Sequence, residues 1–176
     1  MSSMHDLITS WERNWASPRR ISLSGVELPT AVVCRINRPG TSVAGHGHFP
    51  PDVTELWAHA SSAILFLDAD FGQSGLKIFS GSEADSRTAE FAKERARDFL
   101  PGDFVLGEFI GDLELLLVRT DPNERDFGQV LVARPIDGRR YWPPVADRLL
   151  KFLDRFTQAE GEKYWERRAG RPSALT

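Results

Sequence analysis

The chain has 176 residues, 41% of them hydrophobic and 27% charged, a composition typical of one soluble globular domain. Its net charge of -3 gives no overall reason to expect a nucleic-acid or anionic-membrane partner. A single cysteine, Cys34, excludes an internal disulfide. Charged residues interrupt every apolar stretch, so we expect no signal peptide, no membrane helix and a cytoplasmic location.

Residues 1–48 predict one helix followed by an irregular extension. Ser3, with Asp6 three residues later, resembles a helix N-cap, and apolar residues then recur at helical spacing as far as Trp15. Pro18 should end this helix. Residues 21–36 are expected to be extended or irregular, because they combine β-branched residues with helix breakers.

Residues 49–160 predict the domain core, in which two helices precede a run of strands. The expected elements are a helix from Pro51, strands at 62–67 and 76–79, a helix at 82–98, strands at 104–110, 113–120, 129–133 and 139–142, and a last helix that Pro143 and Pro144 open. Gly111 and Asp112 predict a two-residue hairpin loop. Residues 161–176 predict one more helical turn and a tail.

The sequence offers no catalytic or metal-binding constellation. His46 and His48 could supply one edge of a zinc site, but zinc needs three or four ligands, and a mobile loop is the better interpretation. The apolar neighbours of Cys34 predict an inert buried thiol. The sequence contains no GxGxxG, P-loop or GxSxG motif. We therefore expect no enzyme activity, no metal and no cofactor.

Local charge is more informative than total charge. Residues 83–126 carry twice as many acidic as basic side chains, whereas residues 127–176 carry an excess of basic ones. The acidic region is either an ordinary solvated surface or a face that steers a basic partner. Trp142, beside two arginines and a tyrosine, either fills the core or belongs to an interface.

The order of segments from Phe49 to Phe156 resembles the SUKH superfamily, which includes fungal cell-wall-synthesis regulators and bacterial toxin-immunity proteins. The segments that carry this resemblance are FPPDVTELWAHA, SAILFLDAD, LKIFS, LPGDFVLGEFIGDLELLLVRTDP, GQVLVARPIDG and WPPVADRLLKFLDRF. The resemblance implies a single α+β domain, with a mainly antiparallel curved sheet packed against helices and no enzymatic activity.

Bacterial members of this superfamily typically neutralise a secreted polymorphic toxin, often a nuclease or deaminase, by direct binding. The resemblance thus implies a protein partner, with no direct contact to nucleic acid or membrane, for a monomer or weak homodimer. The alternatives are a regulatory scaffold of the same fold and an uncharacterised small-ligand binder or enzyme. The candidate partner-binding residues are Glu108, Asp112, Asp121, Glu124, Asp126 and Trp142.

Overall fold

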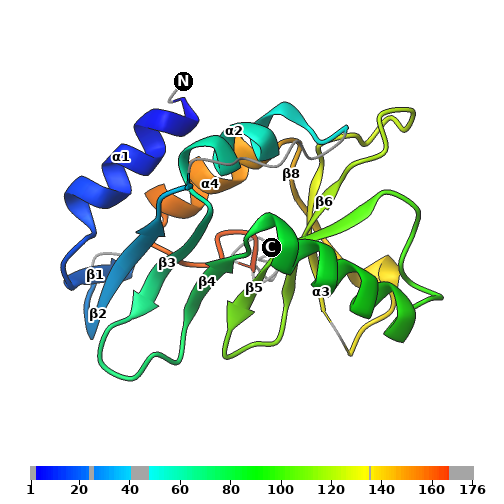
Figure 1. Cartoon of the computed structure of the whole chain (residues 1–176). Coiled ribbons are helices and arrows are strands. Elements are labelled where there is room, and N and C mark those ends of the chain that lie inside the picture. Colours follow the sequence, from blue (N-terminus) through cyan, green and yellow to red (C-terminus); the bar gives the residue numbers. More distant parts are fainter. Residues whose placement is uncertain (1–2, 24–25, 41–47, 135, 167–176) are drawn as a thin grey trace, which may run out of the picture.

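The fold is built around a mainly antiparallel, curved sheet whose eight strands lie side by side in chain order (Figure 1). The computed structural model describes residues 3–23, 26–40, 48–134 and 136–166. The strands are β1 Arg19–Leu23, β2 Val26–Asn37, β3 Ser62–Asp68, β4 Gly75–Ile78, β5 Asp103–Ile110, β6 Leu115–Arg119, β7 Val130–Ala133 and β8 Pro144–Ala146. The helices are α1 Met4–Asn14, α2 Pro51–His59, α3 Gly81–Glu94, the 3-10 helix η1 Arg139–Tyr141, and α4 Leu149–Gln158. The predicted α+β single domain is confirmed.

Helix α1 begins where the sequence predicts. The Ser3 side chain accepts a hydrogen bond from the Asp6 backbone, and the Asp6 side chain accepts one from the Ser3 backbone, which completes a capping box. The fully buried Trp11 donates its indole Nε1–H to Thr157 Oγ1 at 2.8 Å. This bond ties α1 to α4, so the N-terminal helix belongs to the same core as the sheet.

The last helix begins later than predicted. Pro143 and Pro144 do not open it: Pro144 begins β8, which pairs with β7. Helix α4 starts at Leu149, where a distant side chain caps it, because the backbone N–H of Leu150 donates to Asp52 Oδ2 at 2.9 Å. Arg148 also donates to Asp52. The prediction failed because α2 supplies this cap from nearly a hundred residues away.

The strands β5, β6 and β7 are buried along almost their whole length, so both faces of the sheet are covered. On one face, Phe156 of α4 packs against Phe66 and Phe109. Elsewhere, Phe91 of α3 packs against Trp142 with ring centroids 5.9 Å apart. The sequence predicted that Trp142 ends a strand, but it follows the 3-10 helix η1 instead. Its side chain is buried, with only 3% exposed.

When antiparallel strands lie in chain order, every second connection between them falls at the same end of the sheet. The turns after β3 and β5 and the β7–β8 connection therefore lie together at the lower edge of Figure 1, which we call the hairpin end. The β6–β7 connection lies at the opposite end. This arrangement brings segments far apart in sequence onto one surface.

Cys34 is buried, and its Sγ accepts a hydrogen bond from the backbone N–H of Phe66 at 3.3 Å. Burial raises the pKa of this thiol from 9.0 to about 12. Below pH 9 the thiol is neutral in both folded and unfolded chains, so it adds no pH dependence. Above that pH the unfolded chain alone loses the proton, so stability falls as pH rises.

We therefore expect the free energy of unfolding to fall, relative to a Cys34→Ala variant, by about 1.4 kcal/mol per pH unit between about pH 9 and 12. Urea unfolding of both proteins at neutral and alkaline pH measures this difference, because the variant cancels the titration of lysines and tyrosines. A difference independent of pH would contradict the assignment.

Candidate protein-docking surface

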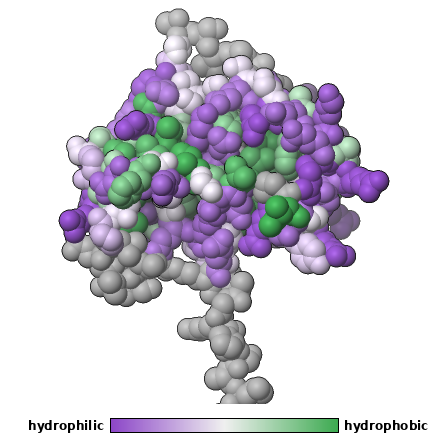
Figure 2. Space-filling view, turned by 90° about the horizontal axis from the view of Figure 1, so that it is seen from below, coloured by the Kyte–Doolittle hydropathy of each residue, from purple (hydrophilic) through white to green (hydrophobic). Residues whose placement is uncertain are grey.

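Three large apolar side chains project into solvent from the hairpin end. Phe71 in the β3–β4 turn is 77% exposed, Leu113 in the β5–β6 turn is 78% exposed, and Ile136 between β7 and β8 is 94% exposed. We call these three residues the apolar tips. Figure 2, which views the molecule from below, shows apolar side chains among polar ones across this end. Single exposed apolar residues are common, but three on neighbouring turns mark a candidate binding surface.

The turn that carries Phe71 is fixed by the buried side chain of Asp68. Asp68 Oδ1 accepts hydrogen bonds from the backbone N–H groups of Asp70 and Phe71, at 3.0 and 3.2 Å. The β5–β6 turn lies directly against this turn. A Cβ on Gly111, which has a φ of +90°, would lie only 2.2 Å from the carbonyl oxygen of Gln73. Phe71 and Leu113 therefore project from two adjoining turns.

Leu113 adopts an unfavourable backbone conformation, with a φ of +57°. A leucine in this left-handed region costs roughly 1–2 kcal/mol, and asparagine or glycine is the usual residue there. The sequence predicted Leu113 as the first residue of a strand after a two-residue loop. Instead β5 ends at Ile110 and β6 begins at Leu115, so the loop is longer. A strained residue with an exposed apolar side chain favours a role in binding over a role in folding.

Replacing Leu113 by asparagine should raise the free energy of unfolding by about 1 kcal/mol, because asparagine tolerates the left-handed region. Leu113→Ala is the matched control: it removes the apolar side chain but keeps the strained backbone, so its stability should equal that of the parent. Denaturant unfolding compares the three proteins. A Leu113→Asn variant less stable than Leu113→Ala would show that this turn is not strained.

The turn that carries Ile136 is held from inside by Trp142. The indole Nε1–H donates to the backbone carbonyls of Arg134 and Asp137, at 3.2 and 3.1 Å. Arg95 of the α3 end donates to the Asp137 carbonyl at 2.7 Å. The ring of Trp142, predicted either to fill the core or to belong to an interface, is buried in the core. It supports the tip at Ile136.

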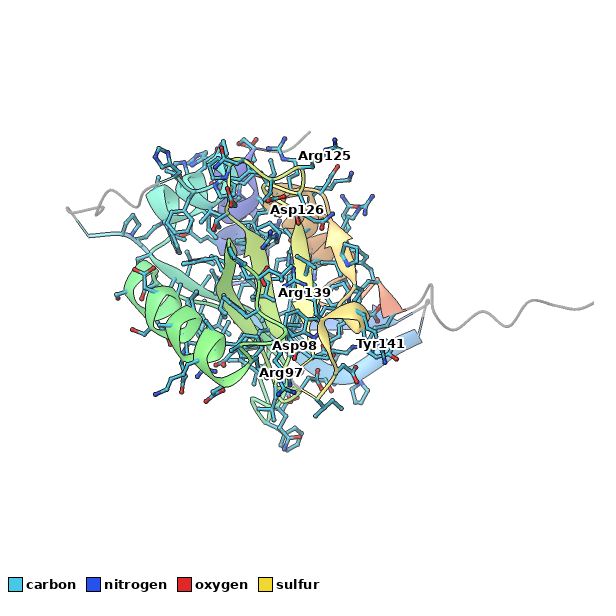
Figure 3. All side chains as sticks on the ribbon, turned by 90° about the vertical axis from the view of Figure 1, so that its right-hand side faces the viewer. Arg97, Asp98, Arg125, Asp126, Arg139 and Tyr141 are labelled. Atoms are coloured by element: carbon cyan, nitrogen blue, oxygen red, sulfur yellow. The ribbon has the colours of Figure 1, made fainter. Side chains whose placement is uncertain are left out.

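The acidic candidates do not gather on one surface. Asp112 lies at the hairpin end, and Glu108 lies nearby on β5. Asp121, Glu124 and Asp126 lie beyond the other end of β6, in the connection where Figure 3 labels Arg125 and Asp126. Five residues of strand separate the two groups by about 17 Å.

Three of these acidic side chains are paired within the molecule. Glu108 forms an ion pair with Arg87 at 3.7 Å, Asp112 with Lys163 at 2.7 Å, and Asp126 with Arg119 at 2.8 Å. Such pairing reduces the field that each carboxylate presents to a partner. Asp121 caps its own turn by accepting from the Asn123 backbone at 3.0 Å, and Glu124 is exposed.

A buried ion network that the sequence did not predict lies at the end of the sheet opposite the hairpin end. Asp103 and Arg119 face each other across β5 and β6, each 5% exposed, with Arg119 Nη1 donating to Asp103 Oδ1 at 2.8 Å. Arg139 also donates to Asp103, and Asp126 accepts from Arg119 Nε. Burial alone would lower the pKa of Arg119, but hydrogen bonds to Asp126 and Asp103 raise it, so the guanidinium stays charged.

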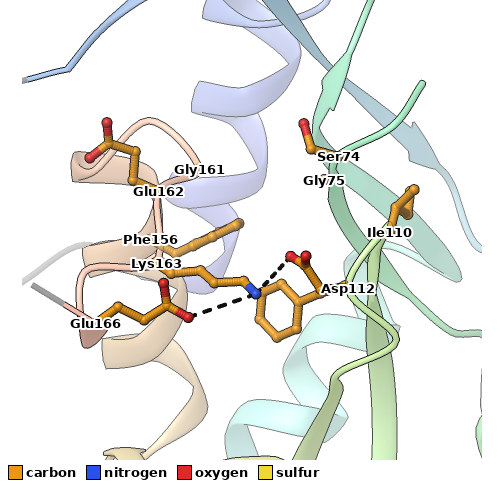
Figure 4. A pocket seen from close by; sticks show the side chains of 10 residues that line it. Ser74, Gly75, Ile110, Asp112, Phe156, Gly161, Glu162, Lys163 and Glu166 are labelled. Atoms are coloured by element: carbon orange, nitrogen blue, oxygen red, sulfur yellow. Dashed lines mark ion pairs between the residues drawn. The ribbon is translucent and has the colours of Figure 1, made fainter. Parts of the chain in front are cut away.

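A cleft of about 410 Å³ opens at the hairpin end, between the sheet and the segment that follows α4 (Figure 4). Phe109 and Phe156 line its apolar part, and the charged side chains of Asp112, Lys163 and Glu166 line its rim. Figure 4 shows the Lys163 ammonium pointing to the carboxylates of Asp112 and Glu166. This site could not be predicted from the sequence, because Lys163 and Glu166 meet Asp112 only through the fold.

Other kinds of site find no support in the described part of the chain. Those residues hold no group of three or more histidine, cysteine or acidic side chains placed for a metal ion. His48 is exposed, whereas His46 lies outside the described residues. No helix among the described residues has the length and apolar character needed to cross a bilayer.

Comparison of the chain with protein-family models, with curated proteins and with solved structures finds no match in any of the three.

Proposed function

We propose that the chain is a non-catalytic protein-binding domain that docks its partner through the apolar tips. The observation that carries this proposal is the exposure of Phe71, Leu113 and Ile136 at one end of the sheet, on turns that the structure holds in place. Burying one such side chain contributes about 1.5–3 kcal/mol. Large side chains that become buried in a complex supply most of the binding energy in protein interfaces, and these three are spread along one end of the sheet.

The partner that we propose is a bacterial polymorphic toxin, which this protein would neutralise as an immunity protein in the cytoplasm. The resemblance of Phe49–Phe156 to the SUKH superfamily supports this class of partner. Turns that are fixed before binding also favour tight association, because little conformational entropy is lost on docking. A regulatory scaffold that binds an endogenous protein would use the same surface and is the second candidate.

The test is a pull-down from lysate of the source cells, followed by co-expression with the captured protein. The proposal expects one stoichiometric partner that is toxic when expressed alone and harmless when co-expressed with this chain. A Leu113→Asn bait should recover less of it. A captured partner without toxicity would support the scaffold instead. Equal recovery by both baits would contradict docking through the apolar tips.

A further inference from the structure

We propose that the cleft beside the apolar tips receives an arginine side chain from the protein partner. This inference rests on the proposed function, and it adds to it the chemistry of one specific contact. The rim residue Asp112 directly precedes Leu113, so the cleft adjoins this tip and a partner that docks there can reach it. The cleft combines what a guanidinium on an apolar stem requires: aromatic rings in its interior and carboxylates at its rim.

Residues in and beside the cleft already stabilise a positive charge, that of the lining residue Lys163. The Lys163 ammonium lies 2.7 Å from Asp112, 2.5 Å from Glu114 and 5.1 Å from the centroid of the Phe109 ring. Burial alone would lower the pKa of Lys163, but hydrogen bonds to Asp112 and Glu114 raise it. The same aromatic and carboxylate groups therefore stabilise a positive charge brought to this end of the sheet.

The internal lysine does not neutralise the cleft. The Glu114 side chain is 12% exposed and pairs with both Lys163 at 2.5 Å and Arg134 at 3.3 Å, so its charge is compensated within the chain. Asp112 and Glu166 remain 56% and 49% exposed at the rim, although Lys163 contacts both.

An arginine suits the two exposed rim carboxylates, Asp112 and Glu166, better than a lysine. Its planar guanidinium can donate to Asp112 and Glu166 together, while Lys163 keeps its contact with Glu114. Its three-carbon stem would pack against the rings of Phe109 and Phe156 that line the cleft. Because the carboxylates are half exposed, this contact contributes more to specificity and association rate than to affinity.

The first test uses a small probe and needs no partner. N-acetyl-arginine methylamide is titrated into the protein while backbone amide NMR signals are followed. The neutral isostere N-acetyl-citrulline methylamide is the control ligand. We expect saturable shifts at residues 74–75, 109–112 and 161–166 with arginine only. Equal shifts with citrulline, or arginine shifts elsewhere alone, would overturn the inference.

The matched variants separate the site from a general charge effect. The double variant Asp112→Asn/Glu166→Gln should abolish the NMR shifts that the arginine probe causes. It retains Glu114, which still pairs with Lys163. Glu124→Gln, which removes an exposed carboxylate at the opposite end of the sheet, should leave them unchanged. Thermal unfolding checks that the double variant is folded. A folded double variant that still binds arginine would overturn the inference.

Binding of the captured partner distinguishes this inference from the proposed function. The double variant should bind it about 10-fold more weakly than the parent, with a weaker salt dependence. A partner that binds both proteins equally, yet depends on Leu113, would overturn the arginine contact and leave the docking proposal standing. An arginine site in a protein that captures no partner would leave the site standing and defeat the proposed function.

Discussion

Replacing Arg119 by methionine should lower the free energy of unfolding by about 3–5 kcal/mol. The methionine fills much of the same space, but Asp103 loses its main partner while its side chain stays wholly buried. Arg139 still contacts Asp103, but its own side chain is 22% exposed and is also engaged with the Asp98 carbonyl. An uncompensated buried charge is among the largest destabilising effects of a single substitution. Urea unfolding measures the loss.

Two further variants identify the buried charge as the cause. Arg125→Met removes an exposed arginine from the β6–β7 connection and should change the free energy of unfolding by less than about 0.5 kcal/mol. Adding Asp103→Asn to Arg119→Met should restore part of the stability, because asparagine is neutral and can still accept from the Leu100 backbone. A loss below about 1 kcal/mol in Arg119→Met would mean that Arg139 alone compensates Asp103.

The parts of the fold that local sequence signals encode were predictable. The capping box at Ser3 and the strands on either side of Gly111 depend on residues close together in the chain. The start of α4 was not predictable, because Asp52 provides its cap across the fold. Residues 139–142 were read as a strand for a related reason: the bonds of Trp142 to the turn before it favour η1 over an extended conformation.

The candidate site was harder to predict from the sequence than the fold. The acidic residues indicated a binding surface in the sequence, because charge can be counted without a structure. Exposure cannot be counted in this way, so the apolar tips were missed. Phe71 stands between Asp70 and Gly72, and Leu113 follows Gly111 and Asp112, so each lies in a predicted turn or beside one. An apolar residue at such a position is the signal that could have found this surface.

The pairing of the acidic residues changes what charge can do for binding. Asp126 is engaged by Arg119 in a network that stabilises the fold, so reversing its charge would test stability together with association. Glu124 and Asp112 are better probes, since both are exposed. They lie at opposite ends of β6, and only Asp112 adjoins an apolar tip. Electrostatic steering and apolar docking therefore coincide at the hairpin end alone.

Replacing all three apolar tips by serine should weaken binding of the partner at least 100-fold and leave the stability of the fold unchanged. Phe71, Leu113 and Ile136 are each more than three-quarters exposed, so their removal costs the folded chain almost no buried area. In the complex, by contrast, the triple variant would lose all the apolar area that these side chains bury against the partner. Most of the change should appear in the dissociation rate, which biolayer interferometry with immobilised protein measures directly.

A single apolar residue outside the surface supplies the matched control. Leu100 is 45% exposed and precedes β5, so it lies at the opposite end of that strand from Leu113. Leu100→Ser should leave the dissociation rate unchanged, which excludes a general effect of surface apolarity. If the triple variant bound like its parent, the exposed tips would have no part in recognition, and the strained backbone of Leu113 would lack a functional reason. If it failed to fold, the tips would be structural, and the position of Leu113 outside the core argues against that result.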